Sequence, residues 1–408
     1  MAAPHFDGSF KVSASDANNQ KLTAGPDGNI WMTLGPAAKN LAKIAPDGKV
    51  TEFELPSVVS PSGIAAGPDG NLWVTEAGGV AKFSPADPVG TTVRTPLSAI
   101  KANASIVAGP DGQMWVATEG RVVHFPTSSP AGAQSVEVEN LSPHDIDVAG
   151  SLLVIADAGN SRIVTLTTTG TQKYVPMLGA NNTSQGVAGS PGGQFAFSLQ
   201  GSPEGLGLVT PPGTPTTLEM LGDPFGVALG SDGAYWFAMF GADNLQRLTP
   251  DGQASPLGGF PPGFGPRQIA AGPNNTLWVA MEKPGENIVE VARISGLEPP
   301  VKTEGKTGGA APETEISKGP KGKVKTKHKR AKVTFRFSST TAGATFECAL
   351  TRAKKGKKPV APRFSSCKSP KTYKLKPGKY TFSVRALSAG AVDPSPATRR
   401  FRVVHIGR

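Results

Sequence analysis

The chain has few cysteines and no long apolar run. Two cysteines among 408 residues exclude a cysteine-rich metal module and a disulfide-dense scaffold. No apolar stretch reaches about 18 residues, so we expect no membrane span. No charged segment followed by an apolar core stands at the N-terminus, so no signal peptide is visible. Apolar residues at helical spacing are also missing, which argues against a solenoid of helices.

Acidic residues are scarce in the last quarter of the chain. Residues 301–408 hold 27 of the 42 Lys and Arg but only five of the 31 Asp and Glu. Residues 1–300 are therefore acidic, and the formal net charge of +11 comes from the tail alone. This asymmetry predicts two domains of opposite charge.

One stretch recurs along residues 1–296. In residues 67–76 it reads GPDGNLWVTE, a Pro-Asp-Gly turn followed by a short apolar run with tryptophan at its centre. The tryptophan position recurs at intervals of 39 to 42 residues. Its seven occupants are Trp31, Trp73, Trp115, Val154, Phe195, Trp236 and Trp278. Seven units of this length indicate a repeat architecture.

Each unit contains four short predicted strands. In the second unit they lie near residues 63–66, 72–76, 80–84 and 91–95. Four strands in roughly 40 residues are typical of a propeller blade, so the sequence predicts a seven-bladed β-propeller. The seventh unit lacks an outer strand, and residues 6–12 resemble one. We expect this N-terminal strand to close blade seven and leave no open sheet edge.

The rest of the chain predicts a linker and a second domain. Residues 297–331 are rich in Pro, Gly, Lys and Thr and predict a flexible basic linker. Strand patterns return at 332–338, 344–352, 372–375, 379–387 and 398–404, with apolar and polar residues alternating after Lys379. Residues 332–408 therefore predict a small immunoglobulin-like β-sandwich, and the fold class is all-β.

Cys348 and Cys367 both lie in this small domain. A bridge between them would close a loop of about 20 residues and stabilise the fold by roughly 3 kcal/mol. The alternative is two separate buried thiols. A disulfide implies an exported protein, so we expect an extracellular or cell-envelope location.

The repeats resemble the virginiamycin B lyase (streptogramin lyase) family, through residues 64–76 (IAAGPDGNLWVTE) and 44–53 (IAPDGKVTEF). The resemblance covers residues 1–296 and implies a seven-bladed propeller. It also implies an activity, in which the ester bond of type B streptogramins is opened by elimination with carboxylate-held Mg²⁺ and a histidine base. The tail resembles a sandwich module of exported actinobacterial proteins, through residues 344–350 (ATFECAL), 367–370 and 380–386.

Two positions per blade should converge at one mouth of the central channel. The first position, just before the inner strand, is occupied by Gln20, Ser62, Ala104, His144, Gln185, Phe225 and Arg267. The second position, at the end of the second strand, is occupied by Leu34, Glu76, Thr118, Asp157, Ser198, Met239 and Met281. This face is the candidate site.

For the elimination, a base must lie close to a carboxylate-held metal. His144 is the candidate base, Glu76 and Asp157 are candidate metal ligands, and Glu282 could contribute if its loop turns inward. Each has a plainer interpretation: His144 as a polar residue at a loop, Asp157 as a turn former, and Glu76 as an acceptor for backbone amides.

An insertion at residues 258–267 should lie at the same mouth. Its Phe264, with Phe225, Met239 and Met281, predicts an apolar half of the mouth that suits an amphipathic small molecule or peptide. The alternative is simple loop packing. The candidate ligand-binding residues are Ser62, Glu76, Asp157, Gln185, Phe225, Phe264, Arg267 and Glu282.

The basic tail could bind an anionic cell-envelope polymer or have no defined partner. Its lysines fall in the linker and turns without interleaved aromatic residues, which argues against nucleic acid. The sequence thus predicts an exported propeller that acts as a binding platform, and it makes no cofactor certain, since Mg²⁺ enters only with the alternative. The alternative is a Mg²⁺-dependent carbon-oxygen lyase that linearises a cyclic ester-containing compound.

Overall fold

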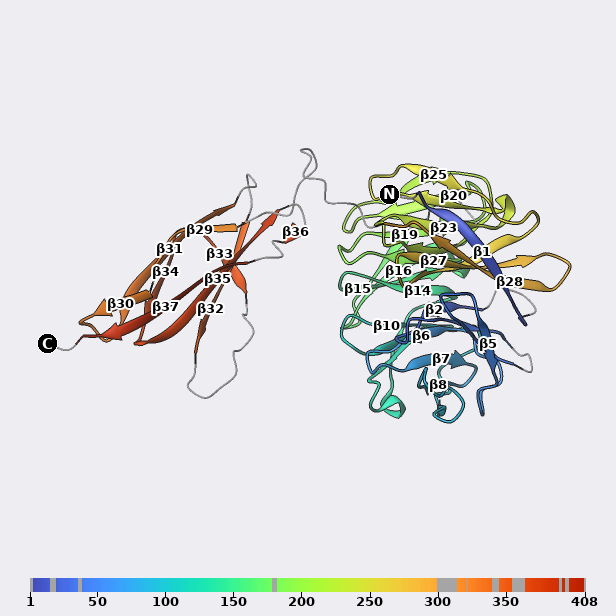
Figure 1. The fold of residues 1–408 in the computed structure, drawn as a ribbon, viewed down its shortest axis with the longest axis horizontal. Helices are drawn as coiled ribbons and strands as arrows, with labels where there is room; N and C mark the ends of the chain where they lie inside the picture. The colour runs from blue at the N-terminus through green and yellow to red at the C-terminus, as the bar shows by residue number, and fades with distance from the viewer. Residues whose placement is uncertain are drawn as a thin grey trace. The chain divides into compact units, whose positions relative to one another are not determined.

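The computed structural model describes residues 3–14, 20–35, 39–177, 182–298, 314–320, 322–339, 345–353, 364–388, 391–392 and 396–406. The regular secondary structure of the described chain consists of strands and three short 3-10 helices, so the all-β prediction is confirmed. It divides into two compact units, residues 1–302 and 303–408 (Figure 1). In this described part no helix is long and apolar enough to cross a membrane.

The described residues of the first unit form seven four-stranded antiparallel sheets, which we call blades one to seven. Blades one to three are β2 (Leu22–Ala24), β3 (Ile30–Thr33), β4 (Leu41–Ile44), β5 (Val50–Phe53); β6 (Ile64–Ala66), β7 (Leu72–Glu76), β8 (Gly79–Phe83), β9 (Val93–Pro96); and β10 (Ser105–Ala108), β11 (Met114–Thr118), β12 (Arg121–Phe125), β13 (Gln134–Glu137). Blades four and five are β14 (Pro143–Ala149), β15 (Leu152–Asp157), β16 (Arg162–Thr167), β17 (Gln172–Pro176); and β18 (Val187–Gly189), β19 (Phe195–Leu199), β20 (Gly205–Val209), β21 (Thr216–Glu219).

Blades six and seven are β22 (Pro224–Leu229), β23 (Tyr235–Met239), β24 (Asn244–Leu248), β25 (Ala254–Leu257); and β26 (Gly265–Gly272), β27 (Thr276–Lys283), β28 (Ile288–Ser295), β1 (His5–Val12). The 3-10 helices are η1 (Pro130–Gly132), η2 (Ala158–Asn160) and η3 (Phe240–Ala242). The innermost strand of each blade, which comes first in blades one to seven as given above, contacts the innermost strand of the next blade. Strand β26 contacts β2, so these inner strands form a closed ring. Strand β1 pairs with β28, the arrangement expected for residues 6–12.

The repeated turn explains why the tryptophan position recurs. In blade two, the Asp69 carboxylate accepts a hydrogen bond from the indole N–H of Trp73 at 3.1 Å. A Cβ on Gly67 would lie 2.6 Å from Cδ1 of that indole, so only glycine leaves room for the ring. Gly70 has φ of +76°, which favours glycine. Blades one, three and six repeat the indole bond through Asp27, Asp111 and Asp232.

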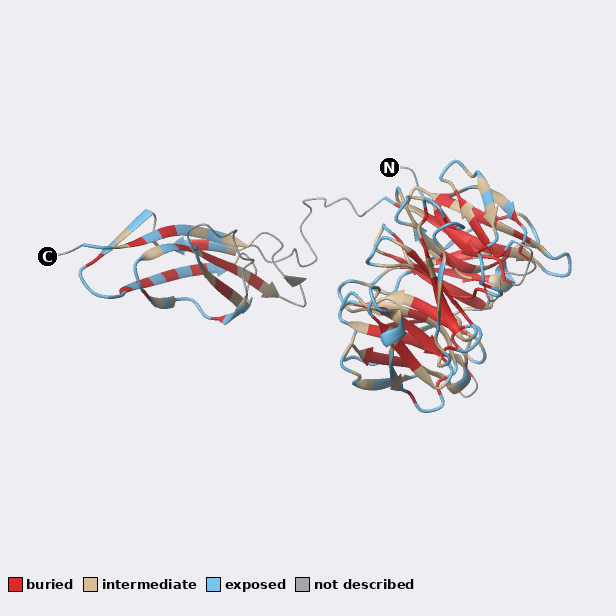
Figure 2. Cartoon of the chain, turned by 90° about the horizontal axis from the view of Figure 1, so that it is seen from below, coloured by how far each residue is buried: buried red, intermediate tan, exposed pale blue. Residues whose placement is uncertain are grey.

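The cores lie between neighbouring blades. Trp73 of blade two, for example, packs with Ile106 and Met114 of blade three. All five tryptophans are at most 1% exposed, and Figure 2 shows the middle strands of the blades as buried. Burial of these large rings holds each blade against the next one.

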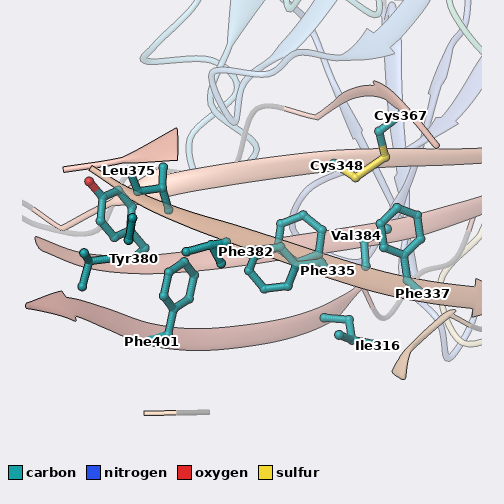
Figure 3. Packing of buried hydrophobic residues seen from close by; sticks show 13 residues of the cluster. Ile316, Phe335, Phe337, Cys348, Cys367, Leu375, Tyr380, Phe382, Val384 and Phe401 are labelled. Atoms are coloured by element: carbon teal, nitrogen blue, oxygen red, sulfur yellow. A yellow bond between two sulfur atoms is a disulfide. The ribbon is translucent and has the colours of Figure 1, made fainter. Parts of the chain in front are cut away.

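The second unit is a β-sandwich. Strands β29 (Thr314–Lys318), β31 (Ala331–Ser339) and β34 (Lys371–Leu375) form one sheet; β30 (Gly322–Thr326), β37 (Ala397–His405), β35 (Gly378–Ser388), β32 (Thr345–Arg352), β33 (Ser365–Cys367) and β36 (Ala391–Val392) form the other. Phe335 of the first sheet stacks on Phe382 of the second, with ring centroids 3.9 Å apart (Figure 3). The disulfide Cys348–Cys367, with Cα atoms 5.8 Å apart, joins neighbouring strands at the edge of this core. The structure thus has the predicted bridge in place of two separate buried thiols.

The predicted linker is wrong at its C-terminal end. Strands β29 and β30 lie within residues 297–331 but belong to the sandwich. Strand β29 pairs with β31, and β30 pairs in parallel with β37, about 80 residues further along the chain. A lysine-rich strand with few apolar residues carries little local signal, so only its distant partner identifies it. Residues 299–313 of the linker lie outside the described residues.

Candidate functional site

The mouth of the first unit contains a cavity of about 140 Å³. It is lined by Lys21, Ser62, Gly63, Asn103, Ala104, Ser105, Pro143 and His144, from blades one to four. The structure therefore brings together three occupants of the first mouth position, namely Ser62, Ala104 and His144. Their proximity follows from the start of the inner strands at one face of the ring.

A larger cavity of about 320 Å³ shares Lys21, Gly63 and Ser105 with the mouth cavity. Inner-strand residues from all seven blades line it, so it is the central channel. Most of its lining is aliphatic, and its charged residues are Lys21, Asp145 and Asp147. We name this group the channel triad.

Lys21 joins three blades at the top of the channel. Its Nζ lies 3.1 Å from Asp145 Oδ1 of blade four and 3.3 Å from Gln268 Oε1 of blade seven. The Lys21 and Asp145 side chains are only 14% and 19% exposed, so the pair is shielded from bulk solvent. Our sequence reasoning missed both residues. The signal was available, because each directly follows an occupant of the first mouth position.

Asp145 and Asp147 satisfy backbone donors on the next inner strand. Asp145 Oδ2 accepts from the N–H of Val187 at 3.2 Å, and Asp147 Oδ2 accepts from the N–H of Gly189 at 2.8 Å. The inner strand β18 is the edge of its sheet, so its backbone N–H groups on the channel side have no partner strand. The two carboxylates accept these hydrogen bonds in place of a strand. Burial raises the pKa of Asp147 to about 7, against the opposing effect of hydrogen bonds from Gly189 and Val148.

His144 is a neutral imidazole at the mouth. Its Nδ1 lies 2.9 Å from the carbonyl oxygen of Gln185, so Nδ1 carries the proton and Nε2 is left as an acceptor. Burial, together with the charges of Lys21 and Arg267, lowers the pKa of His144 to about 3. His144 has the protonation state of a base, but its basicity is low.

Glu76 does not face the mouth as a free carboxylate. It is 4% exposed, pairs with Arg94 of its own blade and accepts the backbone N–H of Val59 at 3.0 Å. The plainer interpretation of Glu76, as an acceptor for backbone amides, therefore describes its contacts. A shallow cavity of about 400 Å³ lies beside this pair, lined by Ser57, Val59, Ser60, Glu76, Ala77 and Arg94.

Asp157 is equally committed. It is fully buried, and Arg162 Nε lies 2.6 Å from its Oδ2. Its Oδ1 accepts from the Ser142 N–H and from Asn160 Nδ2, both at 2.8 Å. Asp157 directly precedes the turn η2, but its carboxylate makes no capping hydrogen bond to that turn, so the turn-former interpretation describes its place and not its contacts. Thr118 and Ser198, at the same position of other blades, likewise accept backbone N–H groups of the loop before their inner strand.

The carboxylates do not fit the magnesium site that the resemblance implies. Every oxygen of Glu76 and Asp157 already accepts a hydrogen bond from an arginine, an amide or a backbone N–H, which leaves these oxygens little capacity for a cation. Among the described residues, no three His, Cys, Asp or Glu side chains are grouped to hold a metal ion.

Arg267, at the start of blade seven, packs its guanidinium against two aromatic rings. Its guanidinium carbon lies 4.3 Å from the Phe225 ring and 3.7 Å from the Phe240 ring, and its Nε contacts Glu282. Glu282 therefore turns towards an arginine, as an ion-pair partner. Gln185 contributes its carbonyl to His144 and its N–H to Ser198, so its backbone is part of the same face.

The predicted apolar half of the mouth does not form as expected. Phe264 is half-buried and packs on the core between blades six and seven. Met239 and Met281 are fully buried in cores. The insertion is instead held by packing, since its Phe260 contacts Phe6 of β1 with ring centroids 5.3 Å apart. Loop packing, the alternative stated above, describes Phe264. Of the four residues predicted for the apolar half, Phe225 alone lies beside a charged group of the mouth, Arg267.

The comparisons with known proteins agree on the fold of the first unit. Residues 6–146 match the virginiamycin B lyase family. A solved streptogramin B lyase is similar with a TM-score of 0.62 and 20% identity, over 72% of this chain and 97% of that chain. A catalytically inactive virginiamycin B lyase from Staphylococcus aureus, solved with quinupristin, gives a TM-score of 0.61 and 20% identity, over 72% and 99% of the two chains.

A further similar structure is the extracellular domain of a one-component system from B. thetaiotaomicron. It has a TM-score of 0.54 and 12% identity, and the match covers 96% of this chain and 57% of that chain. No curated protein matches the chain significantly. The repeats, the closed ring of inner strands and the family match lead to one conclusion: the first unit of this chain is a virginiamycin B lyase-like β-propeller.

Proposed function

We propose that this protein is an exported binding protein. Its propeller binds a small molecule or peptide at the mouth formed by Ser62, His144 and Lys21, and its basic sandwich attaches to an anionic cell-envelope polymer. The disulfide supports export, because such bonds persist in oxidising compartments. The likeness of the fold to an extracellular domain supports the same location.

One observation carries the binding role. The carboxylates Glu76, Asp157 and Glu282 are each bonded to an arginine of their own blade, whereas His144 and Ser62 line a cavity that shares residues with the central channel. This arrangement offers donors, acceptors and an aliphatic wall to a ligand. It does not offer the metal-bound carboxylates that an elimination of the lyase type requires.

The second candidate function is a carbon-oxygen lyase acting on a cyclic ester. His144 favours it, since its Nε2 is an unprotonated acceptor at the mouth. In such a reaction Nε2 would take a proton from the carbon adjacent to the one whose C–O bond breaks, a carbon–carbon double bond would form, and the ester would leave as a carboxylate. The low pKa of His144 makes it a weak base near neutral pH, so we place this function second.

Quinupristin distinguishes the two. The protein is equilibrated with quinupristin by dialysis, with Mg²⁺ and with chelator, and the recovered compound is analysed by mass spectrometry. We expect retention of intact quinupristin in both conditions and weaker retention by Ser62→Leu, which fills the mouth cavity. Linearised product that requires Mg²⁺ and vanishes in His144→Ala would establish the lyase instead. Absence of any retention would remove cyclic depsipeptides from the ligands of this mouth.

A further inference from the structure

Three cations stand in one row across the larger sheet of the sandwich. The register pairs Lys323 of β30 with Arg402 of β37, and Arg402 with Lys379 of β35. Because residues in register point to the same face, these side chains stand side by side on adjacent strands, about 4.8 Å apart. All three are exposed.

This row lies on the outer face of the sheet. The neighbours that alternate with it, Phe401, Val403 and Tyr380, are buried in the core of the sandwich. Arg400 and Lys325 are two residues away from members of the row, on the same outer face. We call these five side chains the cationic face.

Like charges opposite each other on a sheet destabilise it. Strands β30, β35 and β37 carry no Asp or Glu in residues 322–326, 378–388 and 397–405. Among the described residues of this sheet the one acidic side chain is Glu347 of β32, and it is paired with Arg385 at 2.7 Å. Within the part of the sheet that the structure describes, the cationic face therefore has no counter-charge of its own, and an anionic partner would relieve its repulsion.

The other sheet of the unit differs. There the register pairs Lys332 with Lys374 and Lys318 with Arg336, so its cations come in separate pairs. A hydrogen-bonded pair of threonines, Thr334 and Thr372, stands between them. Glu315 adds an exposed acidic residue at its edge strand. Charge is therefore interrupted on this sheet and continuous on the cationic face.

We propose that the cationic face, built on β30, β37 and β35, binds a phosphodiester-linked polyol chain of the cell envelope. This inference rests on the proposed function of the sandwich and names the surface that performs it. A linear polymer with one negative charge per monomer can follow a row of cations across strands. No base stacking is needed, and the five side chains of the face include no aromatic residue.

The test compares two triple variants of the full-length protein with equal loss of charge. The first, Lys323→Gln/Lys379→Gln/Arg402→Gln, removes the row; the second, Lys332→Gln/Arg336→Gln/Lys374→Gln, removes exposed cations from the other sheet. Binding to poly(glycerol phosphate) is measured by fluorescence anisotropy over a salt series, with DNA of mixed sequence as a second polyanion. Thermal melting checks that both variants are folded.

We expect the first variant to bind the polyol phosphate roughly tenfold more weakly at low salt, with a salt slope smaller by about 2, while the second stays within about threefold of the parent. Equal losses in both variants would show attraction by net charge and overturn the cationic face, while leaving polymer attachment intact. Absence of binding by the parent protein would overturn the attachment itself. A row-dependent affinity for DNA alone would replace the polyol partner with nucleic acid.

Discussion

The side chains of Lys21 and Asp145 meet in the central channel with Nζ 3.1 Å from Oδ1, although they belong to blades one and four. Their contact links parts of the ring that share no sheet. It also places a fixed positive charge beside His144, where that charge helps to keep the imidazole neutral. The pair thus connects the stability of the ring to the chemistry of its mouth.

Removal of Lys21 should destabilise the propeller. We expect Lys21→Met to lower the free energy of unfolding by about 1–3 kcal/mol, because Asp145 is left as a shielded carboxylate without its cation. The double variant Lys21→Met/Asp145→Asn should lose less than the sum of the single losses, by roughly 1 kcal/mol. Urea denaturation of the parent, Lys21→Met, Asp145→Asn and the double variant gives the coupling energy between the two side chains. Strictly additive losses would show that the ion pair contributes nothing to stability.

Two residues of blade four should contribute to the pH dependence of stability with opposite signs, so their effects partly cancel in the parent protein. Asp147 has a folded pKa of about 7 against 3.8 unfolded, so its contribution favours folding at low pH and is lost as pH rises towards 7. His144 has a folded pKa of about 3 against 6.5 unfolded, so its contribution is present above 6.5 and is lost as pH falls towards 3.

Single variants should separate these contributions. Relative to the parent, Asp147→Asn should gain stability as pH rises from 3.8 towards 7. His144→Gln should lose stability, relative to the parent, as pH rises from 3 towards 6.5. Each change should be at most about 1.4 kcal/mol per pH unit. Urea midpoints measured across these pH ranges check both signs. If the two variants run parallel to the parent, neither group is shifted in the folded state.

The carboxylate beneath the repeated indole should matter more than the turn itself. We expect Asp69→Ala to cost about 1–3 kcal/mol, because the buried N–H of Trp73 loses its acceptor. Asp47 occupies the same Pro-Asp-Gly sequence in an outer turn, where among the described residues its carboxylate accepts just the N–H of Lys49. Asp47→Ala should therefore cost about 0.5 kcal/mol or less, as is usual for exposed turns. Equal costs in chemical denaturation would show that turn chemistry alone explains the motif.

The disulfide should stabilise only the sandwich. Thiol counting under denaturing, non-reducing conditions should find no free thiol, because Cys348 and Cys367 are joined. The variant Cys348→Ser/Cys367→Ser should lose roughly 3 kcal/mol in the second unit. Calorimetry should show its sandwich transition at lower temperature and an unchanged propeller transition. Two free thiols in the parent would remove the main argument for export.

The blades could be predicted from the sequence because their determinants are local. The turn at Asp69 and the indole of Trp73 are four residues apart, and each unit repeats the same local structure. Strand β1 was predictable for the same reason, since residues 6–12 look like an outer strand. In the sandwich, strong alternation around Tyr380 predicted β35.

The candidate site was harder to predict because its partners are distant in sequence. Glu76 and Asp157 were identified as residues at the ends of strands, but the arginines that pair with them lie in third or outer strands. The positions of Lys21 and Asp145 follow from the repeat, but their pairing joins blades one and four across the channel, and no local pattern specifies which residues meet there. Phe264 was misplaced because a loop phenylalanine can face a ligand or its own core, and only packing decides.

Strand β28, which leads out of the propeller, is not at an edge of its sheet, since β27 bonds it on one side and β1 on the other. A pull transmitted from the sandwich along the chain would act at the end of β28 near Ser295. The hydrogen bonds of β28 to both β27 and β1 would then have to break at the same time for β28 to slide out of the sheet. An outermost strand, in contrast, could be peeled away one bond at a time. Blade closure by the N-terminal strand therefore gives the ring a mechanical strength at the point where a tethered protein would be loaded.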